Sequence, residues 1–132
     1  MKIFIDTNVF LDVLLKRENY HYSLEILNSV LYNKFIGYVS DITLLNIDYV
    51  AKKQMKNIKE FIELVNDNFI VTGADNSVIK SALKINNIDF EDNVQYCSAK
   101  IFNCDVIVTN DKKFVFNGIE ILNSVEFANK YL

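Results

Sequence analysis

The chain has 132 residues, of which 51% are hydrophobic and 23% charged, and its formal net charge is −3. This length suits one domain with a single core, so we expect one domain over residues 1–132. The acidic balance argues against a DNA coat protein or a polybasic membrane binder. No apolar run approaches the roughly 20 residues that span a bilayer, and the N-terminus is unlike a signal peptide.

The two cysteines, Cys97 and Cys104, indicate a reducing compartment. No third or fourth soft ligand lies near them in the sequence, so a zinc site is not expected. Disulfides are rare in cytosolic proteins. We therefore expect both thiols to be reduced core residues and the protein to be cytoplasmic.

Short apolar runs alternate with longer amphipathic patterns along the chain. Runs that are too brief for a helix and rich in β-branched or aromatic residues predict buried strands. Apolar residues spaced three and four apart predict helices. In chain order the pattern predicts a strand at 2–5, helices at 9–15 and 22–31, a strand at 38–39, helices at 42–53 and 58–65, a strand at 69–72, helices at 75–85 and 91–102, strands at 105–108 and 119–122, and a closing helix from 124.

This alternation predicts βαβ units. The fold class is therefore α/β, with a mostly parallel sheet of about five strands covered by helices on both faces. The glycines Gly37, Gly73 and Gly118 stand at the ends of predicted strands, where we expect turns.

Two of the predicted strands end in similar polar sequences. Asp6-Thr7-Asn8 follows the first strand, and Thr109-Asn110-Asp111 follows the strand at 105–108. In an open parallel sheet, ligands bind outside the carboxyl ends of the strands. Two acidic strand ends that meet there predict a divalent-metal site.

Asp6 and Asp111 each have a structural alternative. Asp6 suits the N-cap of the helix that follows, although three capping residues in a row exceed what one cap needs. Asp111 suits a loop turn after Asn110. The similarity of the two strand ends favours a role as metal ligand for both acids.

Asp92 lies in the first turn of the helix at 91–102, where acids interact favourably with the helix dipole. The helical spacing aligns Asp92 with Tyr96 and Ala99, the less polar side, so a ligand role is equally open. Glu91 and Asp89 fall away from this line.

Asn46 is a polar residue within the predicted apolar face of the helix at 42–53. That face consists of Ile42, Leu45, Tyr49 and Val50. An amide on a buried face costs free energy unless it is hydrogen-bonded. Asn46 is therefore either a satisfied core amide or a residue that faces the pocket.

A cation would explain why several acids gather at one place. Two carboxylates about 4 Å apart repel by about 4 kcal/mol at an effective dielectric constant near 20. Mg²⁺ or Mn²⁺ suits a shell of oxygen ligands. The predicted ligands are Asp6, Asp92 and Asp111, with Asn8, Asn46 and Thr109 in support.

Together these motifs resemble the PIN-domain family, the metal-dependent ribonuclease fold that includes VapC-type toxins of bacterial toxin–antitoxin pairs. The resemblance extends over nearly the whole chain. The segments that carry it are 3–12, 38–46, 89–99, 108–114 and 121–127.

The resemblance implies an α/β/α sandwich in which Asp6, Asp92 and Asp111 are the catalytic, metal-binding acids. It implies hydrolysis of RNA phosphodiesters with Mg²⁺ or Mn²⁺, an antitoxin protein as partner and often a homodimer. Lys112 and Lys113 are candidates for contacts with RNA phosphates, with solvated surface lysines as the alternative.

The chain departs from the family at one position. Asn46 stands where most active members have Glu. Its amide oxygen can coordinate a metal but brings no charge. The alternative function is therefore a catalytically impaired PIN-like domain that binds RNA or protein.

A third class is a phosphatase-like or receiver-type domain, which also uses aspartates at strand ends. Such a domain would need an acidic pair where this chain has Asp6-Thr7, so the sequence disfavours it.

Overall fold

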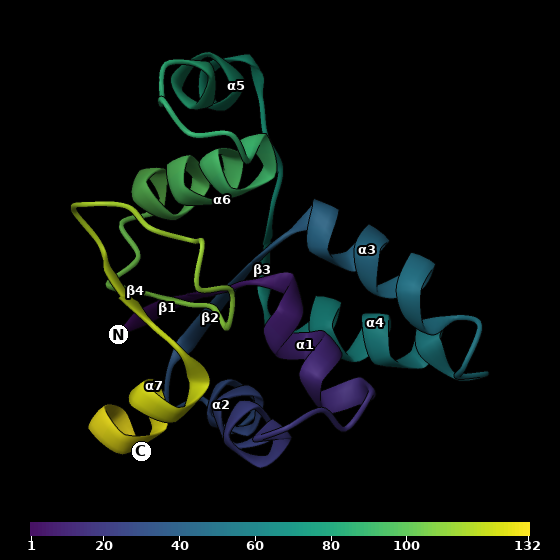
Figure 1. The fold of residues 1–132 in the computed structure, drawn as a ribbon. Helices are drawn as coiled ribbons and strands as arrows, with labels where there is room; N and C mark the ends of the chain where they lie inside the picture. Colours follow the sequence, from purple (N-terminus) through teal and green to yellow (C-terminus); the bar gives the residue numbers. More distant parts are fainter.

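A computed structural model describes residues 1–132, which form one five-stranded parallel sheet and seven helices (Figure 1). The strands are β1 (Lys2–Ile5), β2 (Ile36–Ser40), β3 (Ile70–Thr72), β4 (Val106–Val108) and β5 (Glu120–Leu122). The helices are α1 (Thr7–Leu14), α2 (Tyr20–Leu31), α3 (Asp41–Ala51), α4 (Ile58–Asn68), α5 (Asn76–Leu83), α6 (Phe90–Ile101) and α7 (Ser124–Tyr131). The predicted α/β class and the parallel sheet are confirmed.

The sheet has the strand order β3-β2-β1-β4-β5, so β1 is central. In the register between β1 and β4, Ile5 lies opposite Val108. Asp6 and Thr109 therefore leave the sheet side by side, and the backbone N–H of Asp6 donates to the Val108 carbonyl at 3.0 Å. This pairing brings the two polar strand ends together.

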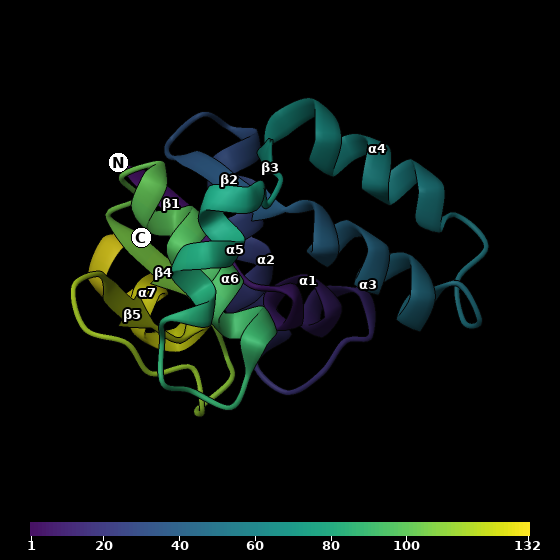
Figure 2. The same cartoon turned by 90° about the horizontal axis from the view of Figure 1, so that it is seen from above.

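Alternate residues of β1 face opposite layers. Ile3 and Ile5 belong to the core shared with α1, α2 and α7, whereas Phe4 packs in the core beneath α5 and α6. Figures 1 and 2 show α6 between the sheet and α5. The result is the three-layer α/β/α arrangement, with α3 and α4 packed side by side and extending beyond the sheet.

Gly37 is not in a turn, contrary to the sequence prediction. It lies inside β2, where a Cβ atom would come within 2.5 Å of Phe69 Cδ2 and 2.8 Å of Val30 Cγ1. The position is kept small by side-chain packing. Gly118, by contrast, has φ +111° and forms the expected turn before β5.

The predicted apolar face of α3 is wrong in part. Leu45 and Tyr49 are 70% and 69% exposed, while the buried residues are Thr43, Ile47 and Ala51. The helix carries apolar side chains on all sides, so their spacing alone does not show which face is buried. Smaller residues at the contact allow α3 to approach α1.

No helix of the chain is both long and apolar enough to cross a membrane. Cys97 and Cys104 are buried and unpaired, as expected for core thiols.

Candidate metal centre at the strand ends

Asp6 connects β1 to α1 and is 5% exposed. Its Oδ1 accepts a hydrogen bond from the Thr7 backbone N–H at 2.7 Å, which caps α1. Its Oδ2 accepts from Asn8 Nδ2 at 2.9 Å and from Thr109 Oγ1 at 2.7 Å. The capping role and a place in the site are therefore compatible, because different hydrogen bonds hold the two carboxylate oxygens.

The Thr109 hydroxyl links the two strand ends. Besides donating to Asp6, its Oγ1 accepts from the Asp111 backbone N–H at 3.1 Å. The half-buried Asp111 accepts from the Lys113 backbone N–H at 2.9 Å, so a turn also forms here. The Thr109 hydroxyl thus joins the Asp6 carboxylate to the backbone of Asp111.

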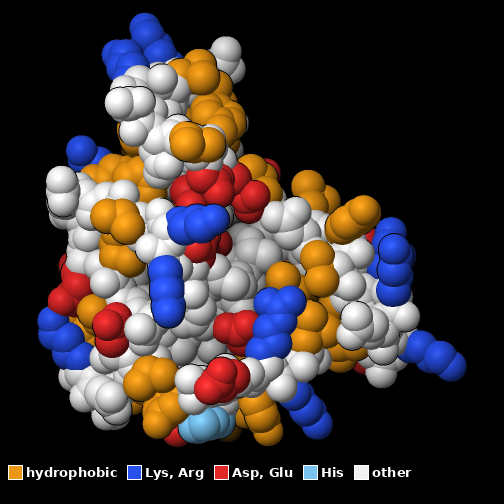
Figure 3. Space-filling model, viewed as in Figure 1, with side chains coloured by type: hydrophobic (Ala, Val, Ile, Leu, Met, Phe, Trp, Pro, Cys, Tyr) orange, Lys and Arg blue, Asp and Glu red, His pale blue; other side chains and the backbone are white.

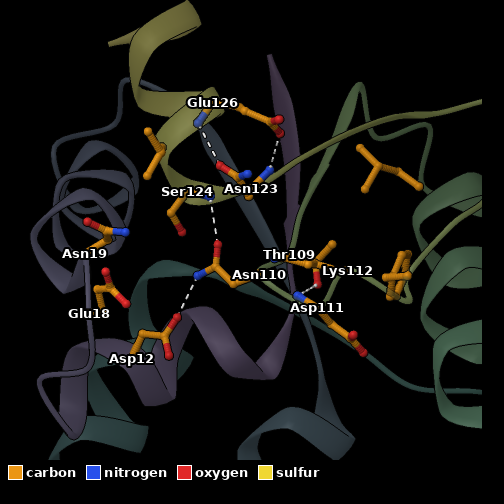
Figure 4. A pocket seen from close by; sticks show the side chains of 13 residues that line it. Asp12, Glu18, Asn19, Thr109, Asn110, Asp111, Lys112, Asn123, Ser124 and Glu126 are labelled. Atoms are coloured by element: carbon orange, nitrogen blue, oxygen red, sulfur yellow. Dashed lines mark hydrogen bonds between the residues drawn. The ribbon is translucent and has the colours of Figure 1, made fainter.

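Asn110 holds the loop after β4 in place. Its backbone N–H donates to Asn8 Oδ1 at 2.9 Å, and its Nδ2 donates to Asp12 Oδ2 at 2.6 Å. Its Oδ1 accepts from the Ser124 backbone N–H at 2.9 Å, so Asn110 lies between Asp12 and Ser124 in Figure 4. This side chain joins α1, β4 and α7, a role beyond the turn that the sequence indicates.

A cavity of about 550 Å³ opens beside this loop. Thr109, Asp111 and Lys112 line one side of it, and the N-terminus of α7 lines another (Figure 4). The polar groups after β4 are therefore reachable from solvent through this cavity, whereas Asp6 and Asp92 do not line it.

Asp92 enters the site from α6. Asp89 is the N-cap of this helix and accepts from the Asp92 backbone N–H at 3.1 Å, so the side chain of Asp92 is not needed as a cap. Asp92 is 5% exposed, and its Oδ2 is buried without a hydrogen-bond partner. Burial is the main cause that raises its pKa to about 7, and the nearby charges of Asp89, Asp6, Asp111 and Glu91 add to it.

Glu91 lies beside these groups as well, although helical spacing sets it off the line of Asp92 and Tyr96. Its Oε1 accepts from Asn46 Nδ2 at 3.0 Å, and the side chain is half-buried. Burial raises the pKa of Glu91, and the charges of Asp6 and Asp89 raise it further. The half-buried Asn46 is thus a hydrogen-bonded amide, and its partner is a fourth carboxylate.

Gln95 is a second group that sequence reasoning left without a role. It is 1% exposed, lies on α6 and has a buried Oε1 without a partner. Burial raises the pKa of Asp6, whereas hydrogen bonds from Thr109 and Gln95 lower it and the charge of Asp111 raises it. The only sequence signal for a role of Gln95 is its position four residues after Glu91 on the predicted helix.

The acids lie at one edge but do not form a closed cage. No three Asp, Glu, His or Cys side chains converge closely enough to hold a metal ion between them. A Mg²⁺ ion keeps several waters and commonly uses only one or two carboxylates. The all-oxygen donor set and the unpartnered buried oxygens of Asp92 and Gln95 fit such an ion.

Lys112 and Lys113 are exposed on the connection between β4 and β5. Figure 3 shows acidic side chains gathered near the end of α6, with Lys and Arg atoms beside them. The site therefore has an acidic centre and a basic margin.

Sequence and structure comparisons place these features in a family. The sequence model of the PIN domain family matches residues 2–113. The chain belongs to the PIN domain family. It is 30% identical to Ribonuclease VapC1 of Aquifex aeolicus (strain VF5) over 141 residues, which covers 98% of this chain and 95% of that protein.

Solved PIN-type structures share the fold. A toxin–antitoxin complex from Klebsiella pneumoniae superposes with a TM-score of 0.71 and 12% identity, covering 92% of this chain and 97% of that one. DNA-bound VapBC from Salmonella typhimurium has a TM-score of 0.70 and 20% identity, covering 94% and 98%. The three-layer sandwich is thus the architecture of this PIN domain.

The raised pKa of Asp92 predicts an unusual pH dependence of stability in the absence of divalent cations. The folded state holds this proton up to a pKa of about 7, against an ordinary value of 3.8. Because the unfolded state binds fewer protons between these values, stability should fall as pH rises from about 4 to 7. Urea unfolding in EDTA at pH 5 and pH 8 measures this.

The variant Asp92→Asn is the control, since it has no group to titrate. Relative to this variant, the wild type should lose about 1–3 kcal/mol of unfolding free energy between pH 5 and 8. An unchanged difference between the two proteins at both pH values would contradict the assignment of a raised pKa to Asp92.

Proposed function

We propose that this PIN domain is a Mg²⁺- or Mn²⁺-dependent endoribonuclease and the toxin component of a bacterial toxin–antitoxin pair. The observation that carries the proposal is that a buried oxygen of Asp92 has no hydrogen-bond partner, in a side chain close enough to Asp6 and Asp111 for their charges to interact. The similarity to Ribonuclease VapC1 over nearly the full length of both chains supports the reaction class.

In this proposal, Asp6 and Asp92 hold the metal directly, and Asp111 does so directly or through water. Thr109 and Asn8 orient the Asp6 carboxylate through hydrogen bonds of 2.7 and 2.9 Å. A divalent ion held by these residues would lower the pKa of a bound water and offset negative charge on the phosphate.

The lysines at the margin have a separate role in the proposal. Lys112 lines the 550 Å³ cavity, and Lys113 follows it on the same exposed loop. Their ammonium groups would contact RNA phosphates and offset the acidic charge that the strand ends present to a polyanion.

The variant Asp6→Asn tests the activity, because it retains a side chain of the same shape and removes a proposed metal ligand. With Mn²⁺ and purified total RNA as substrate, we expect the cleavage rate to fall by at least about 100-fold. Gel analysis of cleavage products with time is the measurement.

Asp67→Asn, at an exposed position of α4, is the matched control and should cleave as the wild type does. If the wild type binds RNA without cutting it, and Asp6→Asn changes nothing, the enzyme assignment fails. The impaired binding domain, suggested by the amide at Asn46, would then be the function.

We propose further that an antitoxin segment docks in an apolar groove between α1, α2 and α4. Leu27 and Phe61 form part of its wall, and Leu24 and Leu64 at its rim are 39% and 44% exposed. Structural relatives of this fold include a toxin–antitoxin complex, which supports a protein partner for this chain.

Leu24→Asp should disrupt that complex because it places a charge on the apolar rim. When this variant is co-expressed with the product of a short neighbouring reading frame, the partner should no longer co-purify with it. Leu83→Asp, at a site 69% exposed on α5 and across the sheet, serves as control. Equal recovery of the partner with both variants would exclude this groove.

A further inference from the structure

We propose that Glu91 supplies the negative charge that Asn46 lacks, so that the fourth acid of the site lies on α6 instead of α3. This inference rests on the proposed metal-dependent function. In this inference the Asn46–Glu91 pair carries one negative charge, which is the charge that the glutamate expected at position 46 would carry.

The contact between the two helices is the first observation. Asn46 on α3 and Glu91 on α6 are separated by 45 residues, and the Asn46 amide N–H donates to Glu91 Oε1 at 3.0 Å. The carboxylate is thus turned toward α3, the helix on which the acid was expected. No side chain or backbone N–H of the protein donates to its other oxygen.

The surroundings of Glu91 link it to the rest of the site. Glu91 and Gln95 are four residues apart on α6 and therefore share a face. Gln95 lies close enough to Asp6 to lower its pKa, and Asp92 follows Glu91 directly. The carboxylate of Glu91 also lies close enough to Asp6 for their charges to interact.

Two buried oxygens of α6 close to Glu91 in the chain have no hydrogen-bond donor in the protein. Asp92 Oδ2 and Gln95 Oε1 accept no hydrogen bond, although their residues are 5% and 1% exposed. Buried acceptors without a partner lower the stability of a fold. A cation that Glu91 helps to hold would satisfy oxygen atoms that no protein donor reaches.

The ordinary role of an acid in the first turn of a helix does not account for Glu91. Asp89, an exposed residue, already caps α6. An acid that served only the helix dipole would need no contact with another helix. Glu91 instead is half-buried and hydrogen-bonded across the site.

The amide at position 46 is also the side chain that suits a neighbouring acid. A second carboxylate within hydrogen-bond distance of Glu91 would repel it, whereas the Asn46 N–H stabilises its charge. With the acid on α6 and the amide on α3, the site therefore keeps one negative charge and one hydrogen bond between the two helices.

Calorimetric titration of the full chain with Mn²⁺ tests the inference without relying on activity. Affinity for hard cations depends on the charge of the ligands, so Glu91→Gln should weaken Mn²⁺ binding by about tenfold or more. Asp89→Asn removes one charge two residues away and preserves the cap, and it should change binding by less than about twofold. The double variant Asn46→Glu with Glu91→Gln exchanges the two groups and should regain affinity within about threefold of the wild type.

The outcomes separate this inference from the proposed function. Equal effects of Glu91→Gln and Asp89→Asn, or no recovery in the double variant when it shows a wild-type circular dichroism spectrum, would overturn the role of Glu91. The variant Asp6→Asn reports on the site as a whole. If the wild type does not bind Mn²⁺, or if Asp6→Asn binds it equally well, the proposed function and this inference both fail.

Discussion

The parallel pairing of β1 with β4 is the constraint on which the site depends. Because Ile5 lies opposite Val108, the chain must place Asp6 and Thr109 next to each other where the strands end. The pairing is maintained by apolar residues on both faces, with Ile3 in one core and Phe4 in the other. Burial of these side chains stabilises a fold whose strand ends carry acidic groups.

The site concentrates like charge in a poorly solvated place. Burial raises the pKa of Asp6, Glu91 and Asp92, and the mutual repulsion of the acids adds to this effect. Hydrogen bonds from Thr109 and Thr7 oppose it at Asp6, as does the nearby Gln95, but an Asp92 oxygen is left without a partner. A divalent cation would remove both the repulsion and the unsatisfied acceptor, so the proposed chemistry also accounts for the electrostatics.

The strand ends could be predicted from the sequence because the signals there are local. A short β-branched run followed by Asp6 or Thr109 marks both the strand and the side of the sheet on which the polar group emerges. Ser40 directly follows the buried part of β2 and caps α3, since its hydroxyl accepts from the Ile42 N–H at 3.2 Å.

The role of Glu91 could not be predicted in the same way. Its partner is 45 residues distant, and the helical spacing of α6 describes only the face toward the sheet. The sequence predicts Leu45 and Tyr49 on the buried face of α3, but both are exposed. A helix with apolar residues on all sides has no unique buried face that its sequence alone can show. In both cases the deciding contact lies between helices that the sheet brings together.

Anomalous diffraction from crystals grown with Mn²⁺ tests the central claim most directly. The account predicts a manganese peak at the carboxyl ends of β1 and β4, within coordination distance of Asp6 and Asp92 oxygens. A structure with saturating Mn²⁺ and no peak among these acids, or a peak only elsewhere on the protein, would contradict it.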